Sequence, residues 1–557
     1  MRKFLDWIDD IAEIGRENKS AAWLERAAFV FLILMVLSAP HSIAATQTAW
    51  LMGTAVFIAR LFINPRPKLI RTPLDFALWA FFGWTVVTSI FSYAPDISIN
   101  KLRGALLFLI FYFVVNNLRS VRAAKFLAFA LIFSCMASVA WAPFERIYGR
   151  GVEISGVDGG SIFTKAVHFD HDTYLRAKGR NLPVSDDAGT TEKNNEFLID
   201  GDTVLEAGGR KIRTPDELLA EIEKNEITYL ECFRTPYYFT LKVRRADLSN
   251  GATALEKLGI GDWKHNRSWR YSGFYSQIIT YAEVLQMIAS LALGLFIALD
   301  RKRSKTGALL ILCLALMILA LLLTFTRASQ SAFLASAAAM FLTFGNRKTL
   351  LISAAVILPL ALAGLVVMQQ IRNVGFFDRS ETSVSYRQTV YGEGVDLWTR
   401  STRNFLLGVG MDSTKRFAGE WNLFEGGRLP MGHFHSTPLQ LLVERGLPAL
   451  ALWLWIFWLY ARMLLRKNSR LQITDYELRE ENNPKSAIRN LKPADWQIQG
   501  IILGCFGALV GFFVSSLVNY SLGDGEVAMV FYILMGIGVS LCLQDSPVKN
   551  VPISSSR

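Results

Sequence analysis

Residues 307–325 read GALLILCLALMILALLLTF, an apolar run without a charged side chain. An α-helix rises about 1.5 Å per residue, so a run of this length can cross the roughly 30 Å hydrocarbon core of a bilayer. Backbone polar groups find no water in that core, and a helix satisfies them within its own segment. This stretch therefore predicts a transmembrane helix.

Similar runs recur along the 557-residue chain, in which 52% of residues are hydrophobic and 19% are charged. This composition excludes disordered, collagen-like and disulfide-scaffold proteins. It predicts an all-α polytopic membrane protein with about 12 transmembrane helices. The predicted spans are 24–44, 47–64, 74–93, 104–118, 123–143, 276–299, 307–325, 328–345, 349–369, 437–461, 498–519 and 526–543, with Pro40 at the break between the first two.

Lysine and arginine are unevenly distributed between the short loops. Cytoplasmic loops are enriched in these residues, and the bias here predicts cytoplasmic N- and C-termini. The net charge of +12 then reflects membrane topology rather than a nucleic-acid interface. The inward-facing loops carry Arg60, Arg66, Lys68, Arg71, Arg119, Arg122, Lys125, Arg301, Lys302, Arg303, Lys305, Arg347 and Lys348, against Lys101, Arg103 and Arg327 on the other side.

This topology divides the chain into membrane and soluble segments. The N-terminal segment contains acidic residues and no small-residue cleavage site, so it is not a cleaved signal peptide. Its apolar residues recur at helical spacing, which favours an amphipathic helix on the inner leaflet, with a solvated tail as the alternative. The predicted segments are a cytoplasmic N-terminus (1–22), helices 1–5 (23–143), a periplasmic segment (144–275), helices 6–9 (276–369), a second periplasmic segment (370–436), helices 10–12 (437–545) with a cytoplasmic loop (462–497), and a cytoplasmic tail (546–557).

The first periplasmic segment contains a small α+β module at about 195–248. Its sequence predicts a strand, a turn at Gly208-Gly209, a second strand, a helix opened by Thr214-Pro215-Asp216-Glu217, and further strands. This order resembles a PDZ-like domain. The carboxylate-binding loop of that family is not visible, so a positioning role is preferred to peptide binding.

A His/Asp cluster and five cysteines could indicate a metal site or disulfides, but their positions in the sequence favour neither. His168, Asp170, His171 and Asp172 could supply metal ligands, but nothing completes the set at a diagnostic spacing, so no metal site is predicted. Of the five cysteines, only Cys232 lies outside the predicted spans, which excludes a disulfide framework.

The second periplasmic segment is crowded with Arg, Asp, Trp and His side chains. The planar fork of Arg can hold two phosphate oxygens at once and keeps its charge, which suits binding of a lipid diphosphate. The alternative is that these arginines neutralise nearby acidic groups or contact lipid headgroups.

Four short motifs follow one another in the second half of the chain. They are RYSGF at 270–274, LTFTRAS at 323–329, Arg387 followed by Trp398 and NFLLGVG at 404–410, and HFHSTPLQLLVERGLP at 433–448. In this order, over about 270–545, they resemble the O-antigen ligase and polymerase family. Asn404, Ser436 and Pro448 depart from the residues usual in that family.

The resemblance implies a fold similar to the membrane-embedded C-type glycosyltransferases, in the bacterial inner membrane. It implies transfer of a glycan from undecaprenyl diphosphate to a periplasmic acceptor, without a metal or other cofactor, and makes 370–436 the catalytic loop. Arg327 and Arg387 are implied to bind the donor diphosphate, and His435 to act as base or orienter for the acceptor hydroxyl. The other residues predicted to bind substrate are Arg270, Trp398, Arg400, Arg403 and His433.

Several functions remain open from the sequence. A ligase would use lipid A-core as acceptor, whereas an O-antigen or exopolysaccharide polymerase would use a growing glycan, and both share these motifs. A lipid-linked oligosaccharide transporter fits less well, because transporters carry ionisable residues within their spans, where here Glu283 is the exception. The expected partners are the lipid-linked donor, the acceptor and the bilayer, with no nucleic acid and with polysaccharide-assembly proteins at the periplasmic insertion. A peptide-sensing receptor would explain only that insertion.

Overall fold

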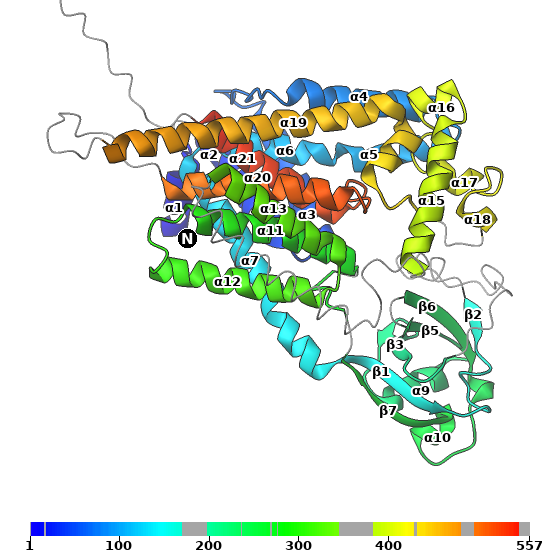
Figure 1. The fold of residues 1–557 in the computed structure, drawn as a ribbon. Coiled ribbons are helices and arrows are strands. Elements are labelled where there is room, and N and C mark those ends of the chain that lie inside the picture. Colours follow the sequence, from blue (N-terminus) through cyan, green and yellow to red (C-terminus); the bar gives the residue numbers. More distant parts are fainter. Residues whose placement is uncertain are drawn as a thin grey trace, which may run out of the picture. The chain divides into compact units, whose positions relative to one another are not determined.

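The computed structural model describes residues 2–15, 18–169, 198–234, 237–267, 270–275, 277–344, 382–427, 432–480 and 495–544. The chain divides into two compact units, one of Met1–Ala140 with Tyr271–Arg557 and the other of Trp141–Arg270. The first unit is helical and the second is built on a β-sheet (Figure 1).

The helices of the first unit run alongside one another in Figure 1, and α15 crosses their ends. Their bounds are α1 (Arg2–Ala12), α2 (Lys19–Ser38), α3 (Ile43–Arg60), α4 (Asp75–Ile90), α5 (Pro95–Ala105), η1 (Leu106–Phe108), α6 (Leu109–Asn117), α7 (Val121–Tyr148, which continues into the second unit), α11 (Ile278–Ala298), α12 (Lys305–Leu323), α13 (Arg327–Phe344), α15 (Thr382–Thr399), α16 (Thr402–Leu407), α17 (Ser413–Phe417), α18 (Phe424–Gly427), α19 (Thr437–Glu480), α20 (Trp496–Ser516) and α21 (Gly525–Leu543).

The polytopic all-α fold is confirmed. Within the described residues, eight helical segments are long and apolar enough to cross a membrane, and α4 is a shorter apolar helix. The eight are Lys19–Ser38, Pro95–Asn117, Val121–Phe144, Ile278–Ala298, Lys305–Leu323, Thr437–Leu471, Trp496–Ser516 and Gly525–Leu543.

The other predicted spans have different outcomes. Those at 47–64 and 328–345 coincide with α3 and α13, which are less apolar because polar residues open each of them. The span predicted at 349–369 lies outside the described residues. The predicted break at Pro40 is confirmed, because α2 ends at Ser38 and α3 begins at Ile43.

The N-terminal segment is a packed helix. Asp9 of α1 accepts two hydrogen bonds from Arg26 of α2, at 2.7 and 2.8 Å. The Trp7 ring meets the Phe126 ring of α7 edge-on at 5.1 Å. The solvated-tail alternative is therefore wrong.

Helix α11 forms the centre of the helical unit, and almost all of its residues are buried. It packs against α20 through glycines: a Cβ atom on Gly500 or Gly504 would lie 2.7 Å from the Cα atom of Leu295 or Leu291. Small residues let two membrane helices approach until their backbones touch, which supplies the packing that lipid cannot. The α11–α20 pair therefore forms the core of this unit.

In its described residues, the second unit contains a seven-stranded antiparallel sheet, in the order β2-β6-β5-β3-β1-β7 with β4 paired to β3. The bounds are β1 (Arg150–Val157), β2 (Val167–Phe169), β3 (Thr203–Ala207), β4 (Arg210–Lys211), α9 (Pro215–Lys224), β5 (Ile227–Arg234), β6 (Tyr237–Arg244), η2 (Arg245–Asp247), α10 (Ala254–Leu258) and β7 (Ile260–Asn266).

The predicted order of elements in the module appears as β3, β4, α9, β5 and β6. The side chain of Thr214 caps α9 by accepting a hydrogen bond from the Glu217 N–H at 3.2 Å, as the local sequence predicts. The likeness to a PDZ domain stays a prediction. His168 lies on β2, whereas Asp170, His171 and Asp172 lie outside the described residues.

A backbone contact joins two segments of the helical unit that are far apart in sequence. The Val409 N–H donates to the Val443 carbonyl at 2.8 Å, and the Gly410 N–H donates to the Glu444 carbonyl at 2.9 Å. Gly446 (φ 72°, ψ −179°) and Gly408 (φ 68°, ψ −170°) adopt a conformation that is essentially restricted to glycine. We call this contact between 408–410 and 443–446 the glycine lock.

Replacing Gly446 by Ala is expected to lower the free energy of unfolding by more than about 2 kcal/mol. The added Cβ would be strained at this φ and would overlap the Leu406 carbonyl oxygen. Thermal unfolding in detergent, followed by tryptophan fluorescence, measures the change. Gly392→Ala in α15 is the matched control, since nothing lies within 4 Å of its Cβ position. Equal stability of the two variants would show that the lock adapts to a side chain.

Candidate functional site

Residues 432–436 form a short loop that enters α19 and carries His433 and His435; we call it the histidine loop. The two imidazole rings lie 4.4 Å apart, measured between centroids. The His435 N–H donates to Nδ1 of His433 at 3.3 Å, so a neutral His433 carries its proton on Nε2. His435 has a positive φ of 47°, which turns the chain back toward α19.

The histidine loop is held from three sides. The Phe434 N–H donates to the side-chain oxygen of Gln440 at 2.8 Å. The Tyr391 hydroxyl of α15 donates to the His435 carbonyl at 3.0 Å. The backbone N–H and the hydroxyl of Thr437 both donate to the Asn519 carbonyl at 3.0 Å. These bonds fix the backbone of both histidines.

Helix α15 supplies the aromatic and cationic partners of His435. The Tyr386 ring meets the His435 ring at a centroid distance of 5.5 Å, nearly perpendicular. Arg387 follows in the helix, and its charge contributes to the lowered pKa of His435. Arg387 and Tyr391 are four residues apart, so one face of α15 presents both toward the histidine loop.

Both histidines are neutral at ordinary pH. Burial, then the neighbouring His433, then Arg387 lower the pKa of His435 to about 3. Burial and then Lys415 lower the pKa of His433, while Asp412 and Asp524 oppose that shift. A neutral imidazole next to a guanidinium group can accept a hydrogen bond or a proton from a hydroxyl group.

The buried carboxylate of Glu444 is connected to the histidine loop by hydrogen bonds. Oε1 of Glu444, which is 2% exposed, accepts from the Asp412 N–H and from the Gln440 amide, each at 2.9 Å. Burial raises the pKa of Asp412, but its ion pairs with Lys101 and Lys415 outweigh burial and leave the pKa below its ordinary value. Gln440 thus connects Glu444 to the histidine loop.

A second buried carboxylate lies at the same end of the helical unit. Oε1 of Glu283 in α11 accepts from Ser515 and Asn519, each at 2.6 Å, and from Ser521 at 3.1 Å. These three donors satisfy a carboxylate that would otherwise be costly to bury. Because the Asn519 carbonyl also receives Thr437, Glu283 helps to hold the segment on which the histidine loop rests.

Arg327 begins α13 and lies at this end as well. Met340 of α13 packs at Gly507 of α20, and Ser336 packs at Gly511, so the two helices are antiparallel. The N-terminus of α13 is therefore placed at the C-terminus of α20, which precedes Asn519. The structure brings Arg327 to the end of the unit that carries Arg387 and His435.

Trp398 and Arg400 lie at the C-terminal end of α15, and Arg403 lies in α16. Trp398 is eleven residues beyond Arg387, about 16 Å along α15. Its indole N–H donates to the Phe405 carbonyl at 3.1 Å, and the indole stacks on the Phe405 ring. Arg400 is exposed near the end of this helix. Arg270 belongs to the second unit.

Arg403 has a separate set of contacts. Its guanidinium group lies 3.9 Å from the centre of the Tyr93 ring and donates to the Phe91 and Gly408 carbonyls. These contacts join the end of α4 to the glycine lock, so the guanidinium group of Arg403 is engaged by other parts of the protein. Substrate binding by Trp398, Arg400, Arg403 and Arg270 stays a prediction.

Sequence patterns do not single out Tyr391 or Tyr520, although both approach the histidines. The Tyr520 ring lies 5.6 Å from the His433 ring. The spacing of Tyr391 from Arg387 is a usable signal, because it places both on one helical face. Tyr520 belongs to the connection between α20 and α21, and no local pattern links it to the histidine loop.

Residues 312–454 match a protein-family model described as O-antigen ligase. A search of curated proteins found no match to the chain. The matched region is narrower than the expected 270–545; it contains Arg327, Arg387, His433 and His435, and it leaves out Arg270. The membrane helices and this match agree with the predicted family. The similarity of the chain to the O-antigen ligase family therefore rests on residues 312–454, about a quarter of its length.

Proposed function

We propose that the protein is an O-antigen ligase of the bacterial inner membrane, which transfers a glycan from undecaprenyl diphosphate to a lipid A-core acceptor on the periplasmic face. The family supports a membrane glycosyltransferase-type enzyme. The observation that carries the proposal is the packing of α15, the helix of Arg387, against the His433–His435 pair: Tyr391 donates to the His435 carbonyl, and the Tyr386 ring contacts the His435 ring. Transfer from a diphosphate needs a cation for the leaving group and a proton acceptor for the attacking hydroxyl.

The arginines are assigned to the donor. Arg387 binds the diphosphate, and Arg327 is the second cation at the same end of the helical unit. The bond between the anomeric carbon and the phosphate oxygen breaks, and the diphosphate leaves with the bonding electron pair. Guanidinium groups stabilise the charge that develops on it, because they stay charged and hold two oxygens at once.

His435 is assigned to the acceptor hydroxyl. The hydroxyl oxygen attacks the anomeric carbon from the face opposite the diphosphate, which inverts its configuration, and the imidazole takes the hydroxyl proton. In the unliganded protein the pKa of His435 is about 3, so the ring is a weak base. A bound diphosphate offsets the charge of Arg387 and raises this pKa, so the base gains strength once the donor is in place.

The orientation of the chain follows from its charged loops. With cytoplasmic termini, the histidine loop and the N-terminus of α13 belong to the periplasmic end. The same topology makes the segment 144–275 periplasmic. We propose its β-sheet unit as a PDZ-like positioning module that binds polysaccharide-assembly proteins.

A transfer assay with the full-length protein in lipid nanodiscs tests this function. The protein receives undecaprenyl-diphosphate glycan with or without lipid A-core, and glycolipid products are resolved by size. We expect a larger lipid A-core product that forms only when the acceptor is present. A ladder of lengthening lipid-linked glycan without acceptor would instead identify a polymerase, and movement of the donor without a covalent product would identify a transporter.

Arg387→Ala is expected to lower kcat about 100-fold or more, the loss typical of removing one donor that stabilises a developing negative charge. Arg387→Lys should restore part of the activity, since it keeps the charge but loses the planar fork. Gln388→Ala is the matched control, because Gln388 is the exposed neighbour in the same helix. If the Arg387→Ala enzyme kept the wild-type kcat, Arg387 would not be the residue that stabilises the leaving diphosphate.

The pH dependence tests the role of His435. Because the pKa of His435 is about 3 in the free enzyme, kcat/KM should show no acid limb from this group between about pH 5 and 8. The kcat profile reports the donor-bound enzyme, so its acid limb should lie at higher pH than that of kcat/KM. An acid limb in kcat/KM near pH 6.5 (about the ordinary histidine value) that disappears in His435→Gln would contradict the lowered pKa of His435 in the free enzyme. A His435→Gln enzyme with wild-type kcat would contradict its role as the base.

A further inference from the structure

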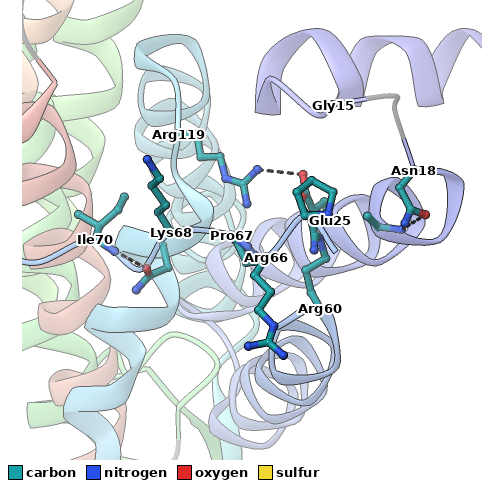
Figure 2. A pocket seen from close by; sticks show the side chains of 12 residues that line it. Gly15, Asn18, Glu25, Arg60, Arg66, Pro67, Lys68, Ile70 and Arg119 are labelled. Atoms are coloured by element: carbon teal, nitrogen blue, oxygen red, sulfur yellow. Dashed lines mark hydrogen bonds and ion pairs between the residues drawn. The ribbon is translucent and has the colours of Figure 1, made fainter. Parts of the chain in front are cut away.

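A pocket of about 400 Å³ lies in the helical unit, between the start of α2, the end of α3, the loop that follows it and the end of α6 (Figure 2). Its lining includes four cationic side chains and one carboxylate. The cationic residues are Arg60, Arg66, Lys68 and Arg119, and the carboxylate is Glu25. The charges of these side chains sum to an excess of three positive charges.

Glu25 holds two of the arginines in place. Its Oε1 accepts from Arg60 at 2.8 Å and its Oε2 accepts from Arg119 at 2.9 Å. Arg60 is 4% exposed and also donates to the Ile63 carbonyl at 2.7 Å. A single carboxylate therefore orders two guanidinium groups but balances only one of their charges.

The other two cations are open to a ligand. Arg66 and Lys68 are exposed, and neither has a hydrogen bond or ion pair within the part of the chain that the structure describes. Figure 2 shows them on the loop that borders the pocket. Exposed cations next to two ordered guanidinium groups give a site that attracts anions with several oxygen atoms.

The loop that carries these residues is anchored at both ends. The Asn18 amide donates to the Asn64 carbonyl at 2.8 Å, and the Ile70 N–H donates to the side-chain oxygen of Asn116 at 2.9 Å. These bonds attach the loop to the start of α2 and to the end of α6. The backbone of the pocket is thus formed before any ligand binds, which lowers the entropic cost of binding.

The pocket lies at the opposite end of the unit from the histidine loop. The helical segment Pro95–Asn117 begins near Asp96, which pairs with Arg416 of α17, and ends near Asn116 in the pocket. The two residues are separated by about 30 Å of helix. The Lys/Arg bias places the pocket end at the cytoplasmic leaflet, where anionic lipids are concentrated.

We propose that this pocket binds the phosphate group of an anionic ligand, supplied by a phospholipid headgroup of the cytoplasmic leaflet or by free phosphate or diphosphate. Arg60 and Arg119 form the ordered part of the site. Arg66 and Lys68 close on the phosphate oxygens. This binding is independent of the glycan transfer proposed above, because it uses residues at the other end of the helical unit.

Binding to the full-length protein in neutral detergent tests the proposal. The titrants are phosphatidylglycerol in mixed micelles, phosphatidylcholine in the same micelles, and inorganic pyrophosphate, with microscale thermophoresis as the readout. Each basic residue near such a headgroup contributes about a fivefold gain in affinity, so Arg66→Gln/Lys68→Gln should weaken binding about thirtyfold. Arg71→Gln is the matched control, because Arg71 is an exposed cation of the same loop that does not line the pocket.

The titrants also separate the two sources of phosphate. Saturable binding of phosphatidylglycerol that pyrophosphate does not displace supports a lipid headgroup, and saturable binding of pyrophosphate supports a soluble ligand. Phosphatidylcholine should not bind. The proposal is overturned if neither anion binds saturably, or if Arg71→Gln weakens binding as much as the double variant. The thermal stability of each variant without titrant checks that the exposed substitutions leave the fold intact.

Discussion

The glycine lock is the contact on which the rest of the candidate site depends. Backbone groups of 408–410 and 443–446 bond to each other directly, and a side chain at either glycine would separate them. The lock breaks α19 at Gly446, so that a short first segment of this helix, with the histidine loop before it, is held at the end of the helical unit. Asp412, two residues beyond the lock, then bonds to Glu444, which connects through Gln440 to the loop.

Buried polar groups explain why the site end of the unit is ordered. In an apolar bundle, an unpaired carboxylate or carbonyl costs several kcal/mol, so such groups persist where partners are supplied. Glu283 receives three side-chain donors, and the same Asn519 that binds it also receives Thr437. The histidine loop therefore rests on a polar network that reaches from α11 to α19. At the opposite end, Glu25 orders two arginines in the same way.

Much of the fold could be predicted because the bilayer imposes a single strong rule. Helices were expected wherever about 20 apolar residues follow one another, and α11, α12, α20 and α21 appear close to the predicted bounds. The length of an apolar run predicts α3 and α13 less clearly, because these helices contain polar residues that face neighbours inside the unit. Ser336 of α13, for example, bonds to the Gly507 carbonyl. Hydropathy measures composition and does not report which partner a polar side chain will find.

The sequence by itself determined the membrane class, the uneven distribution of lysine and arginine between the loops, and the motif residues Arg327, Arg387, His433 and His435. Each of these signals is local, because hydrophobic length, charge and short spacing are readable within one segment. Only the tertiary structure decided that Tyr391 bonds to the histidine loop, that Arg403 contacts Tyr93, and that Glu283 supports the loop. Those outcomes depend on contacts between segments a few tens to hundreds of residues apart, and packing and hydrogen bonding select such contacts only once the helices have assembled.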